Sequence, residues 1–480
     1  MWKPPQRIKY EPSPGTWPNA SEARDARLFQ SLAYQSLSLN DRTWVPAMVP
    51  WRAKETGEAT EDVLDWYGRF ARGKPGGLVV EATGIRDVPS GPLLRIGSDH
   101  FIPGLSSIVD RVREESGSYT RLFIQLIDFL AVRRRPEPQK FFERFLSITD
   151  SHRQALQLES DEEVRMALQA MPEEELEKVL APREFESLTR GFRERVTDTD
   201  LPHIADLPKQ LPELFSAAAA RAKKAGFDGV ELHYAHAYTM ASFLSATNDR
   251  GDEYGGSRQA RVKLALEIID AVRSEVGSDY VVGTRMLTDE CIEGGSTVDD
   301  ACFFATQFAR AGLDYISLSR GGKFDDAKKP KVGWAVYPYT GPSGYECMPQ
   351  YLSDEFGPFG RNIEAAARIR YTVRSKDFET PIIMAGGMHN FEQAEAVLEN
   401  NAADIVGFAR QAIADPDWFE KVRTGHGDEV RLCIYSNYCE GLDQKHKQVT
   451  CNLWDRIDDG KPCKKTSDGK RRLVPPDWDR

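Results

Sequence analysis

The sequence lacks several features, and each absence excludes one class of protein. The first 290 residues contain no cysteine, which excludes the disulfide framework of a small secreted domain. No apolar run reaches 18 residues, and the start MWKPPQRIKYEPSPGTW has no apolar core of the kind that signal peptides carry. We therefore expect a cytoplasmic protein with no membrane contact.

A basic excess is also missing, because the formal net charge is −11. Non-specific binding to nucleic acid needs a positive field, so a nucleic-acid partner is not expected. Phosphorylated ligands and acyl thioesters stay open, since a pocket can carry its own local charge. The sequence has no internal repeat, so any regularity of the fold must be inferred from pattern.

Eight short apolar runs alternate with helical patterns along the chain. Each run is rich in Val, Ile or Leu on both faces, as in a strand buried between a barrel interior and outer helices. The alternation predicts an α/β protein with a closed (β/α)8 TIM barrel. The expected strands are Thr43–Met48, Gly77–Ala82, Arg121–Leu126, Gly229–His233, Tyr280–Met286, Asp314–Ser319, Pro381–Ala385 and Asp404–Phe408, and the expected helices lie near 60–72, 104–115, 210–225, 257–275, 297–311, 361–375 and 390–400.

The residues outside the predicted barrel define the remaining parts of the chain. We expect an N-terminal extension at 1–27, one barrel domain at 28–425 and a cysteine-containing C-terminal extension at 426–480. Segments 131–208 and 320–360 are too long for barrel loops and follow the third and sixth strands, so both should overhang the catalytic face. The first predicts two or three short amphipathic helices. This segment would act as a lid over the catalytic face, or else as a surface decoration or an oligomer contact. A homo-oligomer is therefore possible.

Three polar side chains crowd the end of the fourth predicted strand. His233, His236 and Tyr238 lie in ELHYAHAYT, where barrel enzymes place catalytic groups. Two imidazoles can donate hydrogen bonds to a substrate oxygen, and a phenol can deliver a proton. A single histidine here would more often be structural, but three such groups together predict a catalytic site.

Two adjacent loops predict a phosphate site. Gly386 and Gly387 follow the seventh strand and allow backbone N–H groups to approach an anion closely. Arg410 follows the eighth strand at an expected helix start, and the last two loops form the common phosphate site of these barrels. A glycine pair alone would indicate only a tight turn.

The run HYAHAYT, FLSA, NDRGDEYGGS resembles the old yellow enzyme family, whose pattern is H-x-A-[HN]-G-Y-L, FLSP, N-x-R-x-D-x-YGGS. The resemblance implies an FMN-dependent ene-reductase that takes hydride from NAD(P)H. It further implies that His233 and His236 hold the carbonyl oxygen of an activated alkene and that Tyr238 protonates its α-carbon. Ala237 replaces the usual glycine.

The same resemblance implies which residues contact the flavin. Arg285 would lie at the N1/C2 edge and support negative charge on the reduced ring. Gln125 matches the glutamine of the family's QLxHxGR motif, although Asp128 stands in place of its histidine and the GR is missing. The remaining expected contacts are Ala47, Met48 and Val49 after the first strand, Ala82 after the second, and Ala409 before Arg410.

Cysteines gather in the C-terminal extension, where CIYSNYCEGLDQKHKQVTC resembles the iron–sulfur segment of the 2,4-dienoyl-CoA reductase branch. Ser436 occupies one of the four ligand positions, and Cys439 comes one residue early. A 4Fe–4S cluster normally wants four thiolates. We favour a vestigial segment of free thiols, with a cluster on Cys433, Cys439 and Cys451 as the alternative. No histidine pair has zinc-finger spacing.

The function favoured by these observations is reduction of the C=C bond of an α,β-unsaturated carbonyl compound, or of an enoyl- or dienoyl-CoA thioester. The arginine run Arg133–Arg135 near the expected rim is compatible with the thioester. One alternative is an iron–sulfur flavoprotein subunit that receives electrons from a partner. Another is a flavin-free barrel enzyme or a non-catalytic flavin-binding subunit.

Overall fold

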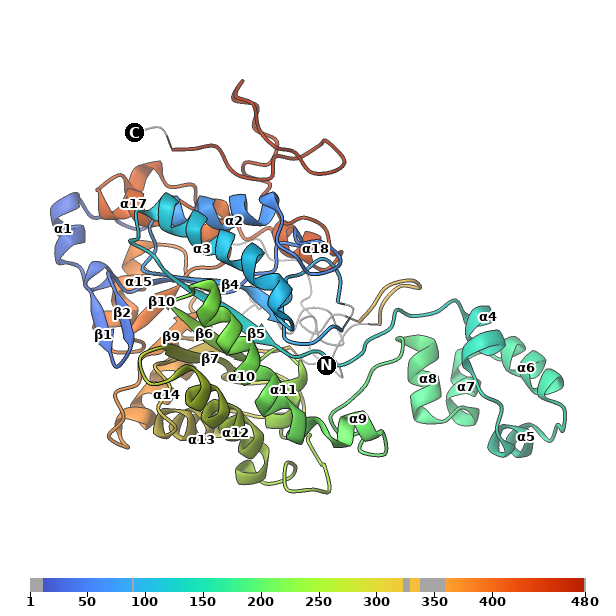
Figure 1. Cartoon of the computed structure of the whole chain (residues 1–480). Coiled ribbons are helices and arrows are strands. Elements are labelled where there is room, and N and C mark those ends of the chain that lie inside the picture. Colours follow the sequence, from blue (N-terminus) through green and yellow to red (C-terminus); the bar gives the residue numbers. More distant parts are fainter. Residues whose placement is uncertain (1–11, 89, 323–328, 337–358, 479–480) are drawn as a thin grey trace.

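The computed structural model describes residues 12–88, 90–322, 329–336 and 359–478. Eight parallel strands form a closed barrel, because β10 pairs with both β9 and β3. All eight predicted strands are confirmed (Figure 1): β3 Thr43–Val45, β4 Gly77–Gly84, β5 Arg121–Ile127, β6 Gly229–Tyr234, β7 Val281–Leu287, β8 Tyr315–Ser319, β9 Ile382–Ala385 and β10 Ile405–Gly407. The predicted (β/α)8 fold is confirmed as well.

Helices between the strands cover the outside of the barrel at the predicted places. Thr297 and Asp300 form a capping box at the start of α13, and Gly226 ends α10 in the left-handed conformation. The main helices are α2 Glu61–Arg72, α3 Ile102–Ser116, α10 Leu207–Ala225, α12 Arg258–Val276, α13 Val298–Arg310, α14 Ile363–Arg374 and α15 Phe391–Glu399. Shorter helices are α1 Ala20–Asp25, α9 Pro202–Ala205, α11 Thr239–Leu244, α16 Arg410–Ala414, α17 Trp418–Arg423 and α18 Tyr438–Asp443.

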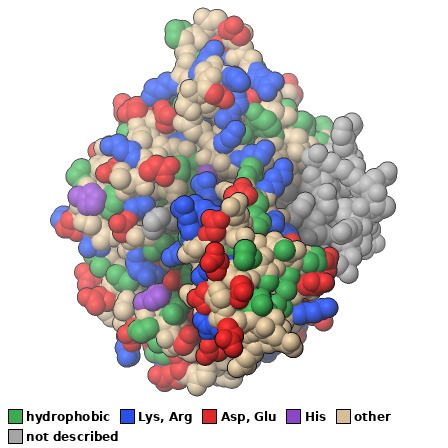
Figure 2. Space-filling model, turned by 90° about the vertical axis from the view of Figure 1, so that its right-hand side faces the viewer, with side chains coloured by type: hydrophobic (Ala, Val, Ile, Leu, Met, Phe, Trp, Pro, Cys, Tyr) green, Lys and Arg blue, Asp and Glu red, His purple; other side chains and the backbone are tan. Residues whose placement is uncertain are grey.

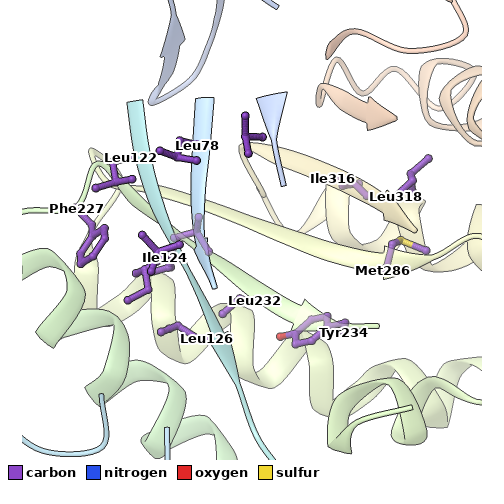
Figure 3. Packing of buried hydrophobic residues seen from close by; sticks show 14 of the residues in the cluster. Leu78, Leu122, Ile124, Leu126, Phe227, Leu232, Tyr234, Met286, Ile316 and Leu318 are labelled. Atoms are coloured by element: carbon purple, nitrogen blue, oxygen red, sulfur yellow. The ribbon is translucent and has the colours of Figure 1, made fainter. Parts of the chain in front are cut away.

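Apolar side chains fill both sides of the strands. Outside the barrel, residues such as Leu122, Ile124 and Leu232 pack against the surrounding helices (Figure 3). Inside, Trp44, Phe123 and Tyr315 fill the base, and a Cβ on Gly283 would lie 2.2 Å from the Tyr315 ring, so only glycine fits there.

A hairpin that the sequence analysis did not predict contributes to the base of the barrel. Strands β1 (Leu32–Tyr34) and β2 (Leu37–Leu39) pair antiparallel. Leu37 and Leu39 are buried in the same cluster as the aromatic rings of the barrel base. The hairpin therefore covers the end of the barrel opposite to the carboxyl ends of the strands.

The insertion at 131–208 forms a helical arm that projects away from the barrel (Figure 1). It contains more helices than predicted, namely α4 Pro138–Lys140, a π-helical turn Phe141–Phe145, α5 Asp150–Leu156, α6 Asp161–Ala170, α7 Glu173–Val179 and α8 Pro182–Thr189. The arm has its own small apolar core, separate from that of the barrel. Figure 2 views the molecule from the side of the arm, and basic side chains gather near the centre of this face.

The second predicted insertion, 320–360, lies largely outside the described residues. Its described part includes Trp334, whose carbonyl accepts a hydrogen bond from the Arg135 N–H at 2.8 Å. The segment before the arm and the segment after β8 therefore run side by side. None of the helices in the described ranges is long and apolar enough to cross a membrane.

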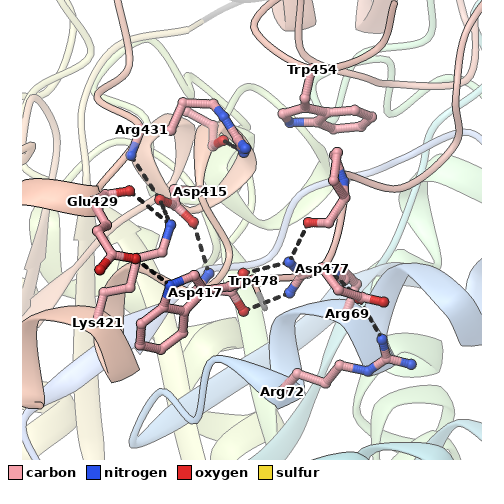
Figure 4. Close-up of polar contacts among 12 residues, drawn as sticks. Arg69, Arg72, Asp415, Asp417, Lys421, Glu429, Arg431, Trp454, Asp477 and Trp478 are labelled. Carbon is pink, nitrogen blue, oxygen red and sulfur yellow. Dashed lines mark hydrogen bonds and ion pairs between the residues drawn. The ribbon is translucent and has the colours of Figure 1, made fainter. Parts of the chain in front are cut away.

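The C-terminal extension is fixed to the barrel by buried polar contacts (Figure 4). The Arg69 guanidinium of α2 donates to both carboxylate oxygens of Asp417, at 2.8 and 2.5 Å, and to the carbonyl of Pro476 at 3.0 Å. Trp454 donates its indole N–H to the carbonyl of Ile413 at 2.8 Å. These contacts bring the extension back over α2 and α16, beside the mouth of the barrel.

Candidate functional site

One large cavity opens at the carboxyl ends of the barrel strands, with a volume of about 890 Å³. This is in the upper part of the range of ligand pockets. The predicted site residues on its wall are Ala47, Met48, Val49, Ala82, Gln125, His233, His236, Tyr238, Arg285, Ala409 and Arg410. Gly386 and Gly387 follow β9 but do not line this cavity.

The register of the strands places the polar residues next to one another. His233 on β6 lies opposite Arg285 on β7, which in turn lies opposite Ser317 on β8. Gln125 on β5 lies opposite Glu231 on β6. Because alternate residues of a strand face the barrel interior, these side chains form one polar layer near the rim.

The two histidines contact each other and are both buried. The N–H of Ala235 donates to His233 Nδ1 at 3.2 Å, so the neutral ring carries its proton on Nε2. His233 Nε2 lies 3.3 Å from His236 Nδ1, and His236 Nε2 lies 2.6 Å from Ser319 Oγ. Ser319, which the sequence analysis missed, ends β8 and lies beside the pair.

Both imidazoles are held in the neutral form. Burial, with a smaller effect from the nearby Arg285 charge, lowers the pKa of His233 from 6.5 to about 3. Burial also lowers the pKa of His236 well below 6.5, and the His233 and Arg285 charges add to this effect. At neutral pH the pair can therefore donate hydrogen bonds without carrying charge.

Tyr238 stands at the start of α11 and lines the same cavity. Its ring packs edge-to-face on Phe129, with centroids 5.2 Å apart, and on His233, with centroids 5.6 Å apart. Burial and the nearby charge of Asp443 raise the pKa of its phenol above the usual value of 10. Tyr238 therefore keeps its proton throughout the physiological range of pH.

Gln125 and Arg285 meet at the floor of the cavity. Gln125 Nε2 donates to the buried Glu231 carboxylate at 2.6 Å, which leaves the Gln125 amide oxygen available to the cavity. Arg285 is 9% exposed and makes only long hydrogen bonds, of 3.4 Å, to Ser317 and Ser319. Among the described residues it forms no ion pair, although its charge acts on the nearby buried carboxylate of Glu231. The cavity floor thus offers a buried cation next to a hydrogen-bond acceptor.

The comparisons with known proteins agree with this architecture. Residues 208–429 match the profile of the NADH:flavin oxidoreductase / NADH oxidase family. The predicted resemblance to this family is confirmed. An NADH oxidase of Thermoanaerobacter brockii is 28% identical over 416 residues, covering 85% of this chain and 52% of that protein.

Solved structures of similar fold include morphinone reductase in complex with tetrahydroNAD, with 25% identity, a TM-score of 0.53 and coverage of 83% of this chain and 91% of that chain. A 2-naphthoyl-CoA reductase complex has 18% identity and a TM-score of 0.64, with 90% of this chain and 57% of that chain covered, and so shows the shared fold alone. The chain spans about half the length of the curated relatives that it matches first.

The predicted phosphate elements are arranged less simply than the sequence suggests. Arg410 donates to Asn437 Oδ1 at 2.8 Å and lies over the Tyr435 ring, 4.6 Å from its centroid. Its guanidinium is thus shared between the large cavity and the C-terminal extension. Gly386 and Gly387 have φ values of 124° and 68°, which suit glycine, as the tight turn requires.

The cysteines of the extension surround a second, much smaller cavity. Cys433, Cys439 and Cys451 line it together with Ser436, and its volume is about 10 Å³, the space of one water molecule. Burial raises the pKa of Cys439 to about 12 and that of Cys451 to about 11, so both are thiols at neutral pH. These residues do not fit a cluster that needs four thiolates. Within the described ranges, no three His, Cys, Asp or Glu side chains are grouped closely enough to hold a single metal ion.

The rim of the large cavity contains residues that the sequence analysis missed. Trp51 donates its indole N–H to Asp443 Oδ1 at 2.6 Å, and its ring stacks on His446 with centroids 4.0 Å apart. Arg134, from the segment before the arm, and Lys445, from the C-terminal extension, line the same rim. Only the arginine run Arg133–Arg135 signalled this in the sequence, because contacts with the extension span some 390 positions of chain.

Prediction: burial of neutral His233 makes the fold sensitive to acid. The unfolded chain binds a proton on this histidine below pH 6.5 and the folded chain only near pH 3, so stability falls as the pH drops through that window. At pH 5 the loss from His233 is at most about 2 kcal/mol. Urea unfolding at pH 7 and pH 5 should show a smaller loss for His233→Gln than for the parent protein. The exposed His100→Gln is the control, and an equal loss in all three proteins would contradict the assignment.

Prediction: the purified protein contains little iron or acid-labile sulfide, and Ser436→Cys, which completes a set of four thiols, increases the iron content. The measurement is iron and sulfide analysis after anaerobic purification. About four irons per chain in the parent protein would instead establish the cluster alternative.

Proposed function

We propose that the protein is an FMN-dependent ene-reductase that transfers hydride from NAD(P)H to the C=C bond of an α,β-unsaturated carbonyl compound. The observation that carries the proposal is the convergence of His233, His236, Tyr238, Gln125 and Arg285 on one cavity. The family match supports a flavin oxidoreductase in general. The flavin-binding unit would be the barrel of residues 28–425 with its insertions.

The residues of the cavity floor suit a flavin ring. The amide oxygen of Gln125 could accept a hydrogen bond from a ring N–H, and Arg285 could stabilise the negative charge of a reduced ring. A volume of about 890 Å³ leaves room for a second molecule above the ring. Ala47, Met48, Val49 and Ala82 would line the ring, and Ala409 and Arg410 would lie toward its phosphate. A phosphate contact of Gly386 and Gly387 stays a prediction, because neither residue lines the cavity. When bound, FMN supplies the hydride that it takes from NAD(P)H.

The histidine pair would bind the carbonyl oxygen of the substrate. Ser319 can donate its hydroxyl proton to His236 Nε2, which leaves the other nitrogen, Nδ1, protonated. Because His233 Nε2 and His236 Nδ1 lie only 3.3 Å apart and contact each other in the structure, the two N–H groups act as donors together only when a substrate oxygen enters between the rings and accepts from both. They stabilise the charge that develops on the carbonyl oxygen as hydride arrives at the β-carbon.

Tyr238 would complete the reaction by giving its phenol proton to the α-carbon. The raised pKa keeps this proton in place until the substrate carbanion, a much stronger base, removes it. The resulting phenolate is then reprotonated from solvent.

An enoyl or dienoyl thioester of coenzyme A is the substrate class that we favour within this activity. Arg134 and Lys445 come from segments far apart in the sequence, yet both line the rim and neither pairs with a carboxylate among the described residues. Burial lowers the pKa of His446, and the charge of Arg134 adds to this effect, which places Arg134 near His446. Such a rim suits the phosphates of a carrier, although the carboxylates of Glu55, Glu440 and Asp443 line the same cavity.

The alternatives make different predictions. Flavin bands in the visible spectrum exclude a flavin-free barrel, and oxidation of NAD(P)H with cyclohexenone excludes a non-catalytic subunit. An iron–sulfur subunit fed by a partner would show iron, sulfide and slow reduction by NAD(P)H.

Prediction: Tyr238→Phe keeps FMN and slows alkene reduction about 100-fold or more, as expected for loss of an acid catalyst. Reduction of the flavin by NAD(P)H should change little, because it needs no proton from the phenol. Stopped-flow measurement of the two half-reactions separates these effects. An unchanged alkene half-reaction would refute the role of Tyr238.

Prediction: Arg134→Ala combined with Lys445→Ala raises KM for an enoyl-CoA thioester about 10-fold and leaves KM for cyclohexenone unchanged. The reason is that only the thioester carries phosphates to the rim, and each exposed contact to a phosphate is worth up to about 1 kcal/mol. Steady-state kinetics with both substrates gives the comparison. Equal changes in both KM values would contradict the thioester.

A further inference from the structure

The turn that presents Tyr238 has an unfavourable backbone conformation. His236 and Ala237 have φ values of 61° and 64°, in the left-handed region that side chains other than glycine disfavour. Each such residue costs on the order of 1–3 kcal/mol, so the surroundings must hold the turn in place. The family motif has glycine at the position of Ala237, where this chain therefore carries additional strain.

The end of β5 holds this turn. Thr239, the residue after Tyr238, donates its hydroxyl to Asp128 Oδ2 at 2.6 Å. Phe129, the residue after Asp128, packs its ring edge-to-face on Tyr238. Two consecutive residues after β5 thus contact the two consecutive residues that begin α11.

Asp128 is itself fully paired. It is 1% exposed, and Arg86 donates to its two carboxylate oxygens at 2.5 and 2.9 Å. Arg86 also donates to the carbonyl of Phe129 at 3.0 Å, which fixes the neighbouring residue. A buried carboxylate with a charged partner and a hydroxyl donor forms a rigid anchor, because losing any partner leaves buried charge unpaired.

We propose that Asp128 is a positioning residue for the proton donor. It acts through Thr239, and it replaces the substrate-side histidine of the family motif with an anchor that holds Tyr238 over the cavity. The proposal rests on the proposed function, since it presupposes that Tyr238 is the proton donor. It assigns Asp128 no contact with substrate. Without this anchor we expect the strained turn at His236 and Ala237 to relax. The phenol of Tyr238 would then no longer point at the substrate α-carbon.

The test is a double-mutant cycle between Thr239 and Tyr238. Thr239→Val keeps the shape of the side chain and removes the hydroxyl, whereas Thr239→Ser keeps the hydroxyl. We expect Thr239→Val to slow the alkene half-reaction about 10- to 100-fold, as misplacement of a catalytic group does, with flavin reduction nearly unchanged. Thr239→Ser should retain most of the parent rate of the alkene half-reaction. In the Tyr238→Phe background, Thr239→Val should have no further effect, because the group that it positions is gone.

The outcomes separate the two proposals. If Tyr238→Phe slows the alkene half-reaction and Thr239→Val slows it further by its full factor, the positioning role is overturned and the proposed function stands. If Tyr238→Phe has no effect, Tyr238 is not the proton donor and the positioning role is overturned with it. The proposed function itself fails if the parent protein binds no FMN or does not reduce alkenes with NAD(P)H. A rate for Thr239→Ser as low as that for Thr239→Val would also overturn the role of the hydroxyl. Asp128→Asn in the same cycle gives a second route should Thr239→Val fold poorly, and thermal unfolding of each variant serves as the control for stability.

Discussion

Closure of the barrel is the constraint on which the rest of the structure depends. Once β10 pairs with β3, no strand edge is left open, and the carboxyl ends of eight parallel strands must surround a single mouth. Side chains that are distant in the sequence, such as Gln125, His233 and Arg285, then occupy neighbouring strands in fixed register. The polar layer at the rim is therefore a consequence of topology, and it needs no flexible loop to assemble it.

Burial then sets the electrical character of the mouth. Burial disfavours the charged form of both imidazoles, and the nearby Arg285 guanidinium adds a smaller effect in the same direction, so His233 and His236 remain neutral donors. Among the described residues, Arg285 on the cavity floor has only long hydrogen bonds, to the hydroxyls of Ser317 and Ser319, besides the charge of the nearby Glu231 carboxylate. An electron-rich ring would stabilise the Arg285 charge better than two hydroxyl groups do.

Local patterns were sufficient to predict the barrel, because strands buried on both faces read as apolar runs and helix caps have their own residue signals. The same patterns could not reveal the hairpin β1–β2, because each of its short strands has an exposed residue at its centre, Ala33 or Ser38, and so is not an apolar run on both faces. They also could not place the C-terminal extension, since its contacts join residues such as Arg69 and Pro476, 407 positions apart. At the site, a strand-end position identified His233 and Tyr238 as candidates, whereas Ser319, Trp51 and His446 became visible only through the fold.

The substitutions relative to the family motif are best understood together. Replacing the glycine of the motif by Ala237 strains the turn after β6, and replacing the histidine by Asp128 would leave a buried charge. Each change alone would cost stability. Arg86 neutralises the carboxylate, and the carboxylate in turn binds Thr239 and restrains the strained turn, so the two costs are offset by one network. The two departures from the motif on either side of Tyr238, Asp128 and Ala237, are thus linked through Thr239.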